Sequence, residues 1–467
     1  MQLHHYHRVH PRLRGVRKAA ATDFPAGSLS PAQVLTAYGF KQNQYVGAAP
    51  KKLGIGSLGG GVVQQDIDNA VTAWGMAAPV LTVRTVGGAD NDPTSDQDSN
   101  VENMLDLLLM SFTWWWLTGT PADITITFGP NASGGMTEVT QDLQAAGVEV
   151  GSWSWGSAAS SWDPTERAGL AAAFAAAIES GMTFCAASGD NSVDDGTSQP
   201  SADYPCSDPS VWAVGGTHLA INPDGSRAQE SAWGDGNPGD EGGGGGYDPT
   251  VSIPSWQQGI IPSSAPGRGV PDTAANADPN SGWQISANGS WTVVGGTSAS
   301  SPFTAALIAA SKGAAHGDIG LLTPAVYAAR LTACNDITTG SNGDPAGPGW
   351  NAATGLGSPN DSSFVDALVA AITGQPAPPA PPAPPPPAPP PPAPPAPPAP
   401  PPPAPPAPPA PPAPPTPPPP SGGPTLQQAQ AWASEGIDAI PGHHLTREEA
   451  KQGSSAGLAA KWTGATS

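Results

Sequence analysis

Residues 29–373 contain two kinds of segment in alternation. Short runs rich in apolar residues have the length of strands, and longer stretches between them have the length and composition of helices. The strand candidates are residues 51–61, 79–86, 122–128 and 148–155, and the helix candidates are residues 64–76, 101–112 and 166–181. Strands that alternate with helices of this length are typical of crossover units. The pattern therefore predicts an α/β fold built on a parallel sheet.

Proline divides the chain. A proline run with interspersed alanines extends from Pro376 to Pro420 and marks a linker over residues 374–423. Because proline lacks the N–H that helices and sheets need, we expect polyproline II, at about 3.1 Å per residue, and a stiff stalk of roughly 140 Å. A ligand for proline-binding modules is the alternative. The other segments are a basic arm at residues 1–28, expected to be disordered, and a small C-terminal module at residues 424–467.

The C-terminal module contains a weak two-copy repeat. In each copy a threonine, Thr425 or Thr446, stands where a helix would begin, and a glycine, Gly436 or Gly457, stands where it would end. We therefore expect two short helices on a long stalk. This arrangement suits docking to a partner, such as a cell envelope or a virus particle. A disordered tail is the alternative.

The chain is strongly acidic, with a formal net charge of −21 over 467 residues. This charge argues against a nucleic-acid partner, which would require a basic face. It suits acidic surroundings, because repulsion among carboxylates fades as they become protonated, although solubility alone explains it equally well. The three cysteines do not make a disulfide framework.

No apolar run reaches the roughly 18 residues of a membrane span. The basic N-terminus lacks the apolar region of a standard secretory signal. An extracellular or surface-associated location is expected without a recognisable signal.

The clearest local signal for chemistry is the segment GGTSASSP at residues 295–302. It follows the strand-like residues 291–294 and precedes the helical residues 303–315. Ser298 is therefore expected at a strand-to-helix turn, where the helix dipole and free N–H groups favour a developing oxyanion. A turn of small residues before a buried helix would look similar, so this segment alone leaves both interpretations open.

The histidines are poorly placed to serve Ser298 as a base. Four of the eight lie in the arm and two lie in the tail, which leaves His218 and His316. Neither lies in the HGT-like turn typical of the subtilisins, and we expect both to be structural or surface residues. A subtilisin-like Ser-His-Asp triad therefore lacks its middle member.

The order of short motifs over roughly residues 29–372 resembles the sedolisins, the serine-carboxyl peptidases, and most of all their bacterial kumamolisin type. Each motif is weak alone, but together and in this order they are highly specific. They read LSPAQVLTAYGF, IGSLGGG, VENMLD, SWSWG, AASGD, YPCSDPSVWAVGGT, SIPSWQ, GRGVPDTAANADP, GGTSASSP, NDITTG and GPGWNAATGLGSP. The resemblance implies a subtilisin-like parallel sheet flanked by helices.

The resemblance also implies the catalytic residues. It makes Ser298 the nucleophile, Glu102 the general base, Asp106 its orienting partner and Asp190 the acid of the oxyanion hole. The positions are physically reasonable for Glu102 and Asp106, because residues four apart share one face of a helix. The surrounding helix is heavily apolar, and two buried neighbouring carboxyls cannot both ionise cheaply. We therefore expect them to share a proton, whereas a solvated helix face is the alternative.

The implied reaction is hydrolysis of protein or peptide substrates by an endopeptidase with an optimum near pH 3 to 5, where carboxyls titrate. By analogy with the family, Ser154, Trp155, Gly156 and Ser188 line the substrate cleft. We expect a monomer.

A calcium site is implied at the C-terminal landmark. Its ligands would be the side chain of Asp336, the backbone oxygens of Ile337, Gly347 and Gly349, and the side chain of Asn351. The family has aspartate at the last of these positions. The loss of that charge is expected to weaken the site.

Two further departures from the family favour a different interpretation. Ser57 stands where kumamolisin-like enzymes carry a glutamate that extends the carboxylate network. Only about 28 residues precede the match, whereas the family is normally made with a long prodomain. The alternative is therefore a weak or inactive sedolisin scaffold that acts as a displayed binding or structural protein.

Overall fold

The computed structural model describes residues 9–11, 14–19, 27–197, 199–236 and 240–375. Most of the predicted linker at residues 374–423 and the whole module at residues 424–467 lie outside the described residues. No helix in the described part of the chain is long and apolar enough to cross a bilayer.

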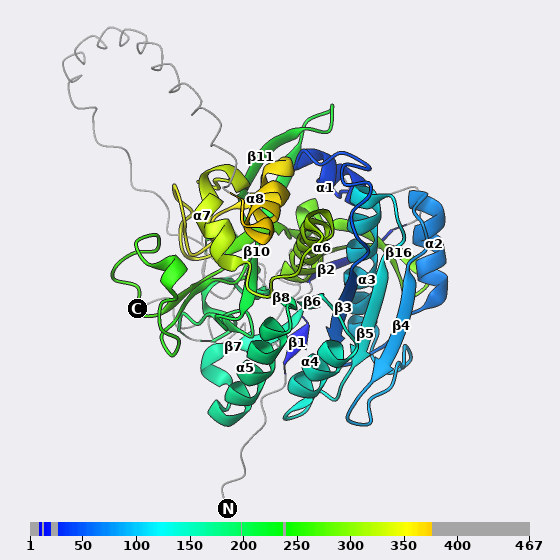
Figure 1. Cartoon of the computed structure of the whole chain (residues 1–467), viewed down its shortest axis with the longest axis horizontal. Coiled ribbons are helices and arrows are strands. Elements are labelled where there is room, and N and C mark those ends of the chain that lie inside the picture. Colours follow the sequence, from blue (N-terminus) through cyan, green and yellow to red (C-terminus); the bar gives the residue numbers. More distant parts are fainter. Residues whose placement is uncertain (1–8, 12–13, 20–26, 198, 237–239, 376–467) are drawn as a thin grey trace, which may run out of the picture. The chain divides into compact units, whose positions relative to one another are not determined.

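A largely parallel sheet of eight strands forms the centre of the fold (Figure 1). Its order is β11-β10-β8-β6-β3-β5-β4, with β14 also paired to β10, and only β11 is antiparallel to its neighbour. The strands are β3 (Lys52–Ser57), β4 (Val80–Thr85), β5 (Asp123–Phe128), β6 (Val150–Trp153), β8 (Thr183–Ala187), β10 (Val211–Ile221), β11 (Arg227–Ala232) and β14 (Thr273–Asn276). Parallel strands of this kind are apolar on both sides because helices cover both faces.

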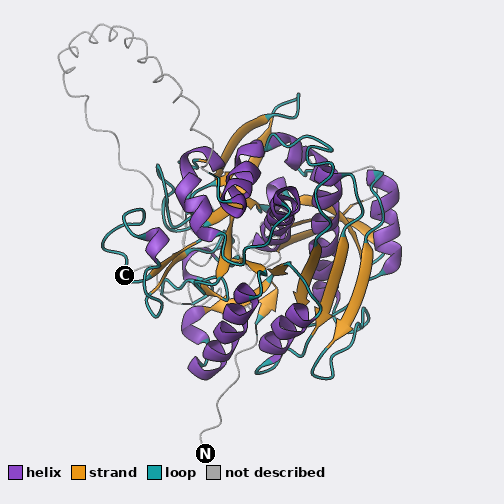
Figure 2. Cartoon of the chain, viewed as in Figure 1, coloured by secondary structure: helices purple, strands orange, loops and turns teal. Residues whose placement is uncertain are grey.

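Helices bury the two faces of the sheet in two apolar clusters (Figure 2). On one side α3 (Gln97–Thr118) and α6 (Thr297–Ala315) pack against each other, with α1 (Pro31–Ala37), α7 (Thr323–Ala333) and α8 (Asp361–Thr373) contributing to the same core. On the other side α4 (Gly135–Ala145) and α5 (Pro164–Glu179) pack together. Helix α2 (Gln64–Trp74) packs against α3 near one edge of the sheet. The predicted parallel sheet flanked by helices is confirmed.

Part of the N-terminal arm forms strands, so the prediction that residues 1–28 are disordered is wrong for residues 10–11 and 14–19. Strand β1 (His10–Pro11) pairs with β7 (Trp155–Ala158), and β2 (Arg14–Ala19) pairs with β16 (Ser290–Gly295). Strand β7 also pairs with β9 (Asp203–Tyr204), and β16 pairs with β15 (Trp283–Ala287). Basic composition suggested disorder, but pairing with distant strands overrides local preference.

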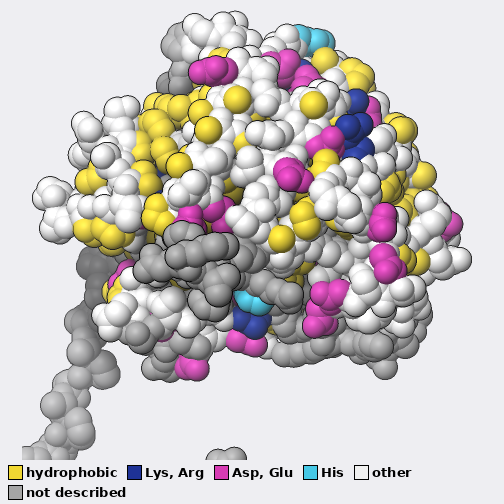
Figure 3. All heavy atoms as spheres, turned by 90° about the horizontal axis from the view of Figure 1, so that it is seen from below, with side chains coloured by type: hydrophobic (Ala, Val, Ile, Leu, Met, Phe, Trp, Pro, Cys, Tyr) yellow, Lys and Arg dark blue, Asp and Glu magenta, His cyan; other side chains and the backbone are white. Residues whose placement is uncertain are grey.

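Short elements complete the described chain. They are β12 (Gly246–Asp248), β13 (Arg268–Val270), β17 (Cys334–Asn335) and β18 (Ser358–Pro359), with single 3₁₀ turns at Ala159–Ser161, Ser192–Asp194, Ser255–Gln257 and Pro279–Ser281. The surface face drawn in Figure 3 carries scattered carboxylates and few Lys or Arg side chains, in keeping with the net charge of −21.

Candidate active site

Ser298 lies at the turn between β16 and α6, as the sequence predicts. Strand β16 ends at Gly295 and α6 begins at Thr297. Gly296 joins them with φ at +112°, a conformation that residues with side chains rarely adopt. Ser298 is fully buried in the first turn of α6, where N–H groups have no acceptor within the helix.

Glu102 is the hydrogen-bond partner of Ser298. The Ser298 hydroxyl donates to Glu102 Oε2 over 2.9 Å, although the two residues lie on different helices, α6 and α3. Glu102 is fully buried, and its Oε1 has no hydrogen-bond partner among the described residues. Burial raises the pKa of Glu102 well above its usual range, and the neighbouring Asp106 adds to this effect.

Asp106 contacts the site through the Ser154 hydroxyl. The Ser154 hydroxyl donates to Asp106 Oδ1 over 2.7 Å, and the Ser154 backbone oxygen lies 3.5 Å from Ser298 Oγ. Glu102 Oε1 and Asp106 Oδ2 are both buried without another partner among the described residues. The sharing of one proton between the two carboxyls stays a prediction. Burial raises the pKa of Asp106 well above its usual range, against the lowering effect of Ser154.

Asp190 lies at the other side of the Ser298 turn, just after β8. Its Oδ1 accepts two hydrogen bonds from Thr297, one from the backbone N–H at 2.7 Å and one from the hydroxyl at 2.8 Å. The Gly189 N–H also donates to the Thr297 hydroxyl over 3.2 Å. These contacts attach the β8 turn to the residue beside Ser298.

Ser57, one of the departures from the family, adds no carboxyl to the site. It is fully buried at the end of β3, and its hydroxyl donates to Gly59 O over 3.1 Å. Asn103, which follows Glu102 in α3, donates to the same oxygen over 2.9 Å. The turn after β3 is therefore fastened to α3 by an amide.

The two histidines of the central region are used elsewhere. His218 Nδ1 lies 2.8 Å from Asp278 Oδ2, and this hydrogen bond raises the pKa of the imidazole. His316 is the left-handed residue that ends α6. Neither occupies the position beside Ser298, where the structure places Glu102.

The arm pairs with two strands whose ends are near Ser298 in the sequence or the structure. His10 pairs with Gly156 and Pro11 with Trp155. Arg14 pairs with Gly295, three residues before Ser298. Composition gave no signal for these pairings.

Val9, the residue before β1, is buried in the apolar cluster that contains Trp155 and Leu58. The Val9 backbone oxygen accepts from Asn131 Nδ2 over 2.9 Å. An extended polypeptide segment is thus held along the strand that the family resemblance assigns to substrate binding.

The four predicted cleft residues make different contacts. Gly156 is required by close packing, because a Cβ there would lie 2.4 Å from Asp203 Oδ1. Trp155 is buried against the arm, and Ser154 bridges Asp106 and Ser298. Ser188 is fully buried and its hydroxyl donates to Gly244 O over 2.7 Å, so its side chain holds a glycine-rich loop, while its place in the cleft stays a prediction.

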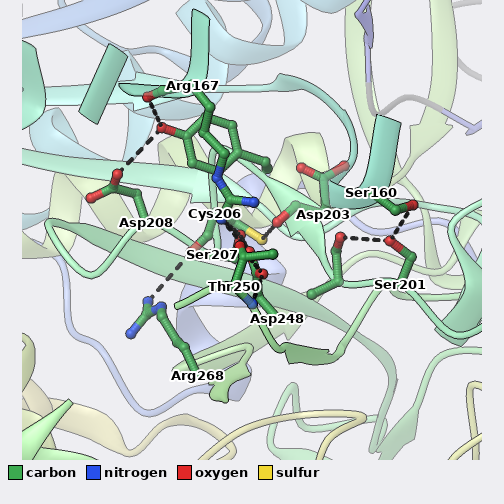
Figure 4. A network of polar contacts seen from close by, with 12 residues as sticks. Ser160, Arg167, Ser201, Asp203, Cys206, Ser207, Asp208, Asp248, Thr250 and Arg268 are labelled. Atoms are coloured by element: carbon green, nitrogen blue, oxygen red, sulfur yellow. Dashed lines mark hydrogen bonds and ion pairs between the residues drawn. The ribbon is translucent and has the colours of Figure 1, made fainter. Parts of the chain in front are cut away.

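Beyond Gly156, strand β9 pairs with β7, and a polar network connects β9 to α5 and β12 (Figure 4). The Tyr204 hydroxyl donates to Arg167 O over 3.2 Å and lies 3.3 Å from Asp208 Oδ2. Arg167 also forms an ion pair with Asp248, whose carboxylate accepts from Ser207 over 2.7 Å. An open pocket of about 720 Å³ lies beside this network, lined partly by Trp162, Arg167 and Asp208.

The predicted calcium ligands lie together in the loop between β17 and β18. The oxygens of Ile337, Gly347 and Gly349 all face the side chain of Asn351, and both carboxylate oxygens of Asp336 lie 3.1 Å from the Gly349 N–H. The described residues contain no group of three or more His, Cys, Asp and Glu side chains suited to a metal.

Comparison with known proteins identifies the family. The model of the subtilase family matches residues 119–357. Kumamolisin from Bacillus sp. (strain MN-32) is 33% identical over 384 residues, which cover 78% of this chain and 67% of kumamolisin. Sedolisin from Pseudomonas sp. (strain 101) is 30% identical over 383 residues, which cover 75% of this chain and 63% of sedolisin. The chain thus spans about two thirds of the length of these curated relatives.

A solved structure of Pseudomonas sedolisin, a serine-carboxyl proteinase complexed with two molecules of pseudo-iodotyrostatin, superimposes with a TM-score of 0.65 at 27% identity. The match covers 75% of this chain and 99% of that structure. The fold is therefore of the subtilase class. Within that class, the chain belongs to the sedolisin family of serine-carboxyl peptidases and is similar to its kumamolisin type.

Proposed function

We propose that this chain is a serine-carboxyl endopeptidase that acts in acid, with Ser298 as its nucleophile. The proposal rests on the 2.9 Å hydrogen bond from Ser298 Oγ to Glu102 Oε2 inside a buried site. A hydroxyl is a weak nucleophile until a positioned base accepts its proton, and Glu102 is the group in position. Attack on a peptide carbonyl gives an acyl-enzyme on Ser298 and releases an amine, and water then hydrolyses the ester.

Glu102 acts as base and then as acid. It accepts the Ser298 proton during attack and gives that proton to the leaving nitrogen. The first step requires ionised Glu102. Because the pKa values of Glu102 and Asp106 are raised, only a small fraction of Glu102 is ionised at pH 4, and this fraction falls further as the pH falls. Asp106 supports Glu102 and Ser298 through Ser154, whose hydroxyl donates to Asp106 Oδ1 over 2.7 Å.

Asp190 donates a hydrogen bond to the oxyanion in this proposal. A carboxylate would repel the developing charge, whereas a neutral carboxylic acid stabilises it. Because Asp190 Oδ1 accepts from the Thr297 N–H, the proton is expected on the other oxygen. Activity should therefore end on the alkaline side when Asp190 loses this proton.

An endopeptidase is favoured over an enzyme that removes short N-terminal peptides. Pro11 pairs with Trp155 and Arg14 pairs with Gly295, so one chain is held by two strands near Ser298. Two residues before Pro11, Val9 is still held in a buried position, and the sequence continues for eight more residues before it. A site beside which a chain is held by two strands suits cleavage within a polypeptide.

The test is digestion of a denatured protein at pH 4 by the full chain and by Ser298→Ala, with mass spectrometry of the products. We expect internal cleavage by the wild type and none by the variant. Equal digestion by both, or by neither, would contradict the proposal, and release of successive short N-terminal peptides would contradict the endopeptidase mode.

Ser57 is the observation that favours the alternative, a displayed scaffold of little or no activity, because it contributes no carboxyl to the site. Inactivity of the wild type in the digestion assay would support that alternative. We further propose an extracellular or surface-associated protein that acts as a monomer, with no nucleic-acid partner. Docking of residues 424–467 to an envelope or virion remains a hypothesis about residues that the structure does not describe.

A further inference from the structure

Three backbone oxygens converge on one side-chain nitrogen in the loop between β17 and β18. Asn351 Nδ2 lies 3.2 Å from Ile337 O, 3.1 Å from Gly347 O and 3.4 Å from Gly349 O. Backbone oxygens gathered around one point are the ligands that a calcium ion takes in proteins. Here a group that carries a partial positive charge and two hydrogens occupies that point.

The orientation of the Asn351 amide follows from its other contacts. Its Oδ1 accepts from the backbone N–H of Ala353 at 3.2 Å, the N–H of Thr354 at 2.9 Å and the Thr354 hydroxyl at 3.0 Å. A backbone N–H can only donate, so it requires the oxygen of the amide and not the NH₂ group. The NH₂ group must then face the three backbone oxygens, which can only accept.

This arrangement does not fit a calcium ion. Calcium–oxygen distances are about 2.3–2.6 Å, so an ion shared by the same three oxygens would collide with the amide hydrogens. Turning the amide over would bring its NH₂ group against the N–H groups of Ala353 and Thr354. Two buried donors would then lose their acceptor, a costly loss. Asp336 would be left as the one carboxylate among the predicted ligands.

We propose that the Asn351 amide takes the place of a metal ion, so that this loop is held together without calcium. The chain keeps the three converging backbone oxygens, but one of its own side chains occupies the space between them. The two hydrogens of the amide are shared among the three oxygens, and no ion from the medium is needed. The sequence-based expectation of a weakened calcium site is thereby replaced by a loop that does not bind the ion.

The loop matters because it leads to the candidate active site. Asn342 Nδ2 donates to Gly243 O over 2.7 Å, and the neighbouring Gly244 N–H donates to Gly189 O over 2.7 Å. Gly189 precedes Asp190, whose carboxyl binds Thr297 beside Ser298. A loop that is internally closed therefore supports the Asp190 turn at any calcium concentration.

The test uses the full chain in the Ser298→Ala background, so it does not depend on peptidase activity. Thermal unfolding is followed in EDTA, in Ca²⁺ and in Mg²⁺ for the parent and for Asn351→Asp. The parent is expected to shift by less than about 1 °C between EDTA and Ca²⁺. The Asp variant places a carboxylate oxygen against the three carbonyls. It should melt lower in EDTA and rise by about 5 °C when Ca²⁺ exceeds its dissociation constant about 100-fold.

Asn342→Asp is the matched control, because Asn342 is an amide in the same region with only one carbonyl acceptor. It is expected to lose stability without a response to Ca²⁺. Luminescence of Tb³⁺, excited through tryptophan, provides a second readout if Asn351→Asp unfolds in EDTA, and a signal is expected from that variant alone.

Two outcomes would overturn the inference. One is a parent protein that loses stability in EDTA and regains it with Ca²⁺. The other is an Asn351→Asp variant that responds to neither Ca²⁺ nor Tb³⁺, since the loop would then be no cradle for a cation.

Discussion

The buried Glu102 should make this fold more stable in acid than at neutral pH. Its pKa is raised in the folded state, first by burial and then by Asp106. A carboxyl whose folded pKa is raised binds its proton more tightly in the folded chain. Its stabilising effect is fully present below the unfolded value of about 4.3 and is lost as the pH rises through the folded value.

The magnitude follows from proton linkage. In the window between the unfolded and folded pKa values, folding takes up one proton at Glu102, and the free energy of unfolding falls by about 1.4 kcal/mol per pH unit. Glu102→Gln keeps the shape of the side chain but cannot ionise. In this window the free energy of unfolding of the variant should fall less steeply with pH, by about 1.4 kcal/mol per pH unit. Above the window the variant should be more stable than the parent.

Urea denaturation from pH 4 to 7 in the Ser298→Ala background, followed by the fluorescence of the 15 tryptophans, measures these slopes. Glu138→Gln, an exposed residue of α4, is the matched control and should change the free energy of unfolding by less than about 0.5 kcal/mol throughout. A Glu102→Gln variant less stable than its parent at pH 7, with an unchanged slope, would refute the reasoning. It would mean that the folded site stabilises the ionised carboxylate.

Three other predictions concern activity. Glu102→Gln in the active chain should lower kcat by about 10²–10⁴-fold at pH 4 with little change in KM, and a normal kcat would remove Glu102 as the base. Asp190→Asn keeps a neutral donor that does not titrate, so the alkaline fall in kcat/KM should weaken. Asp190→Ala should lose about 10²–10³-fold in kcat at all pH values. Identical pH profiles for the Asn variant and the wild type would contradict a role of Asp190 in stabilising the oxyanion. Ser154→Ala removes a hydroxyl that lowers the pKa of Glu102 directly, so the acid limb of the kcat profile should move to higher pH, and an unmoved limb would show that Ser154 does not tune the base.

The fold was predictable because its central elements are long or strongly apolar. The helix predicted at residues 101–112 exists, but it extends over Gln97–Thr118 because Asp96 caps its first turn and Gly119 ends it. Both signals are present in the sequence. The strand expected at residues 148–155 is instead two strands, β6 and β7, separated at Ser154. No proline or glycine marks that break, which depends on where the two strands find partners.

The candidate site was predictable in its members and less so in its contacts. The motifs name Ser298, Glu102, Asp106 and Asp190, and the structure brings the first two within hydrogen-bond distance. The bridging role of Ser154 was missed, because it depends on a hydroxyl that reaches Asp106 from the break after β6. The arm was missed because its strands exist only through pairing with β7 and β16.

The pairing of β1 with β7 and of β2 with β16 affects the apparent affinity of any molecule that binds against the same strands. The arm is covalently attached, so it competes at an effective concentration on the order of millimolar, however dilute the protein is. Dilution cannot relieve this competition. A peptide or inhibitor would show an apparent affinity for the full chain that is lowered by the ratio of that local concentration to the arm's own dissociation constant.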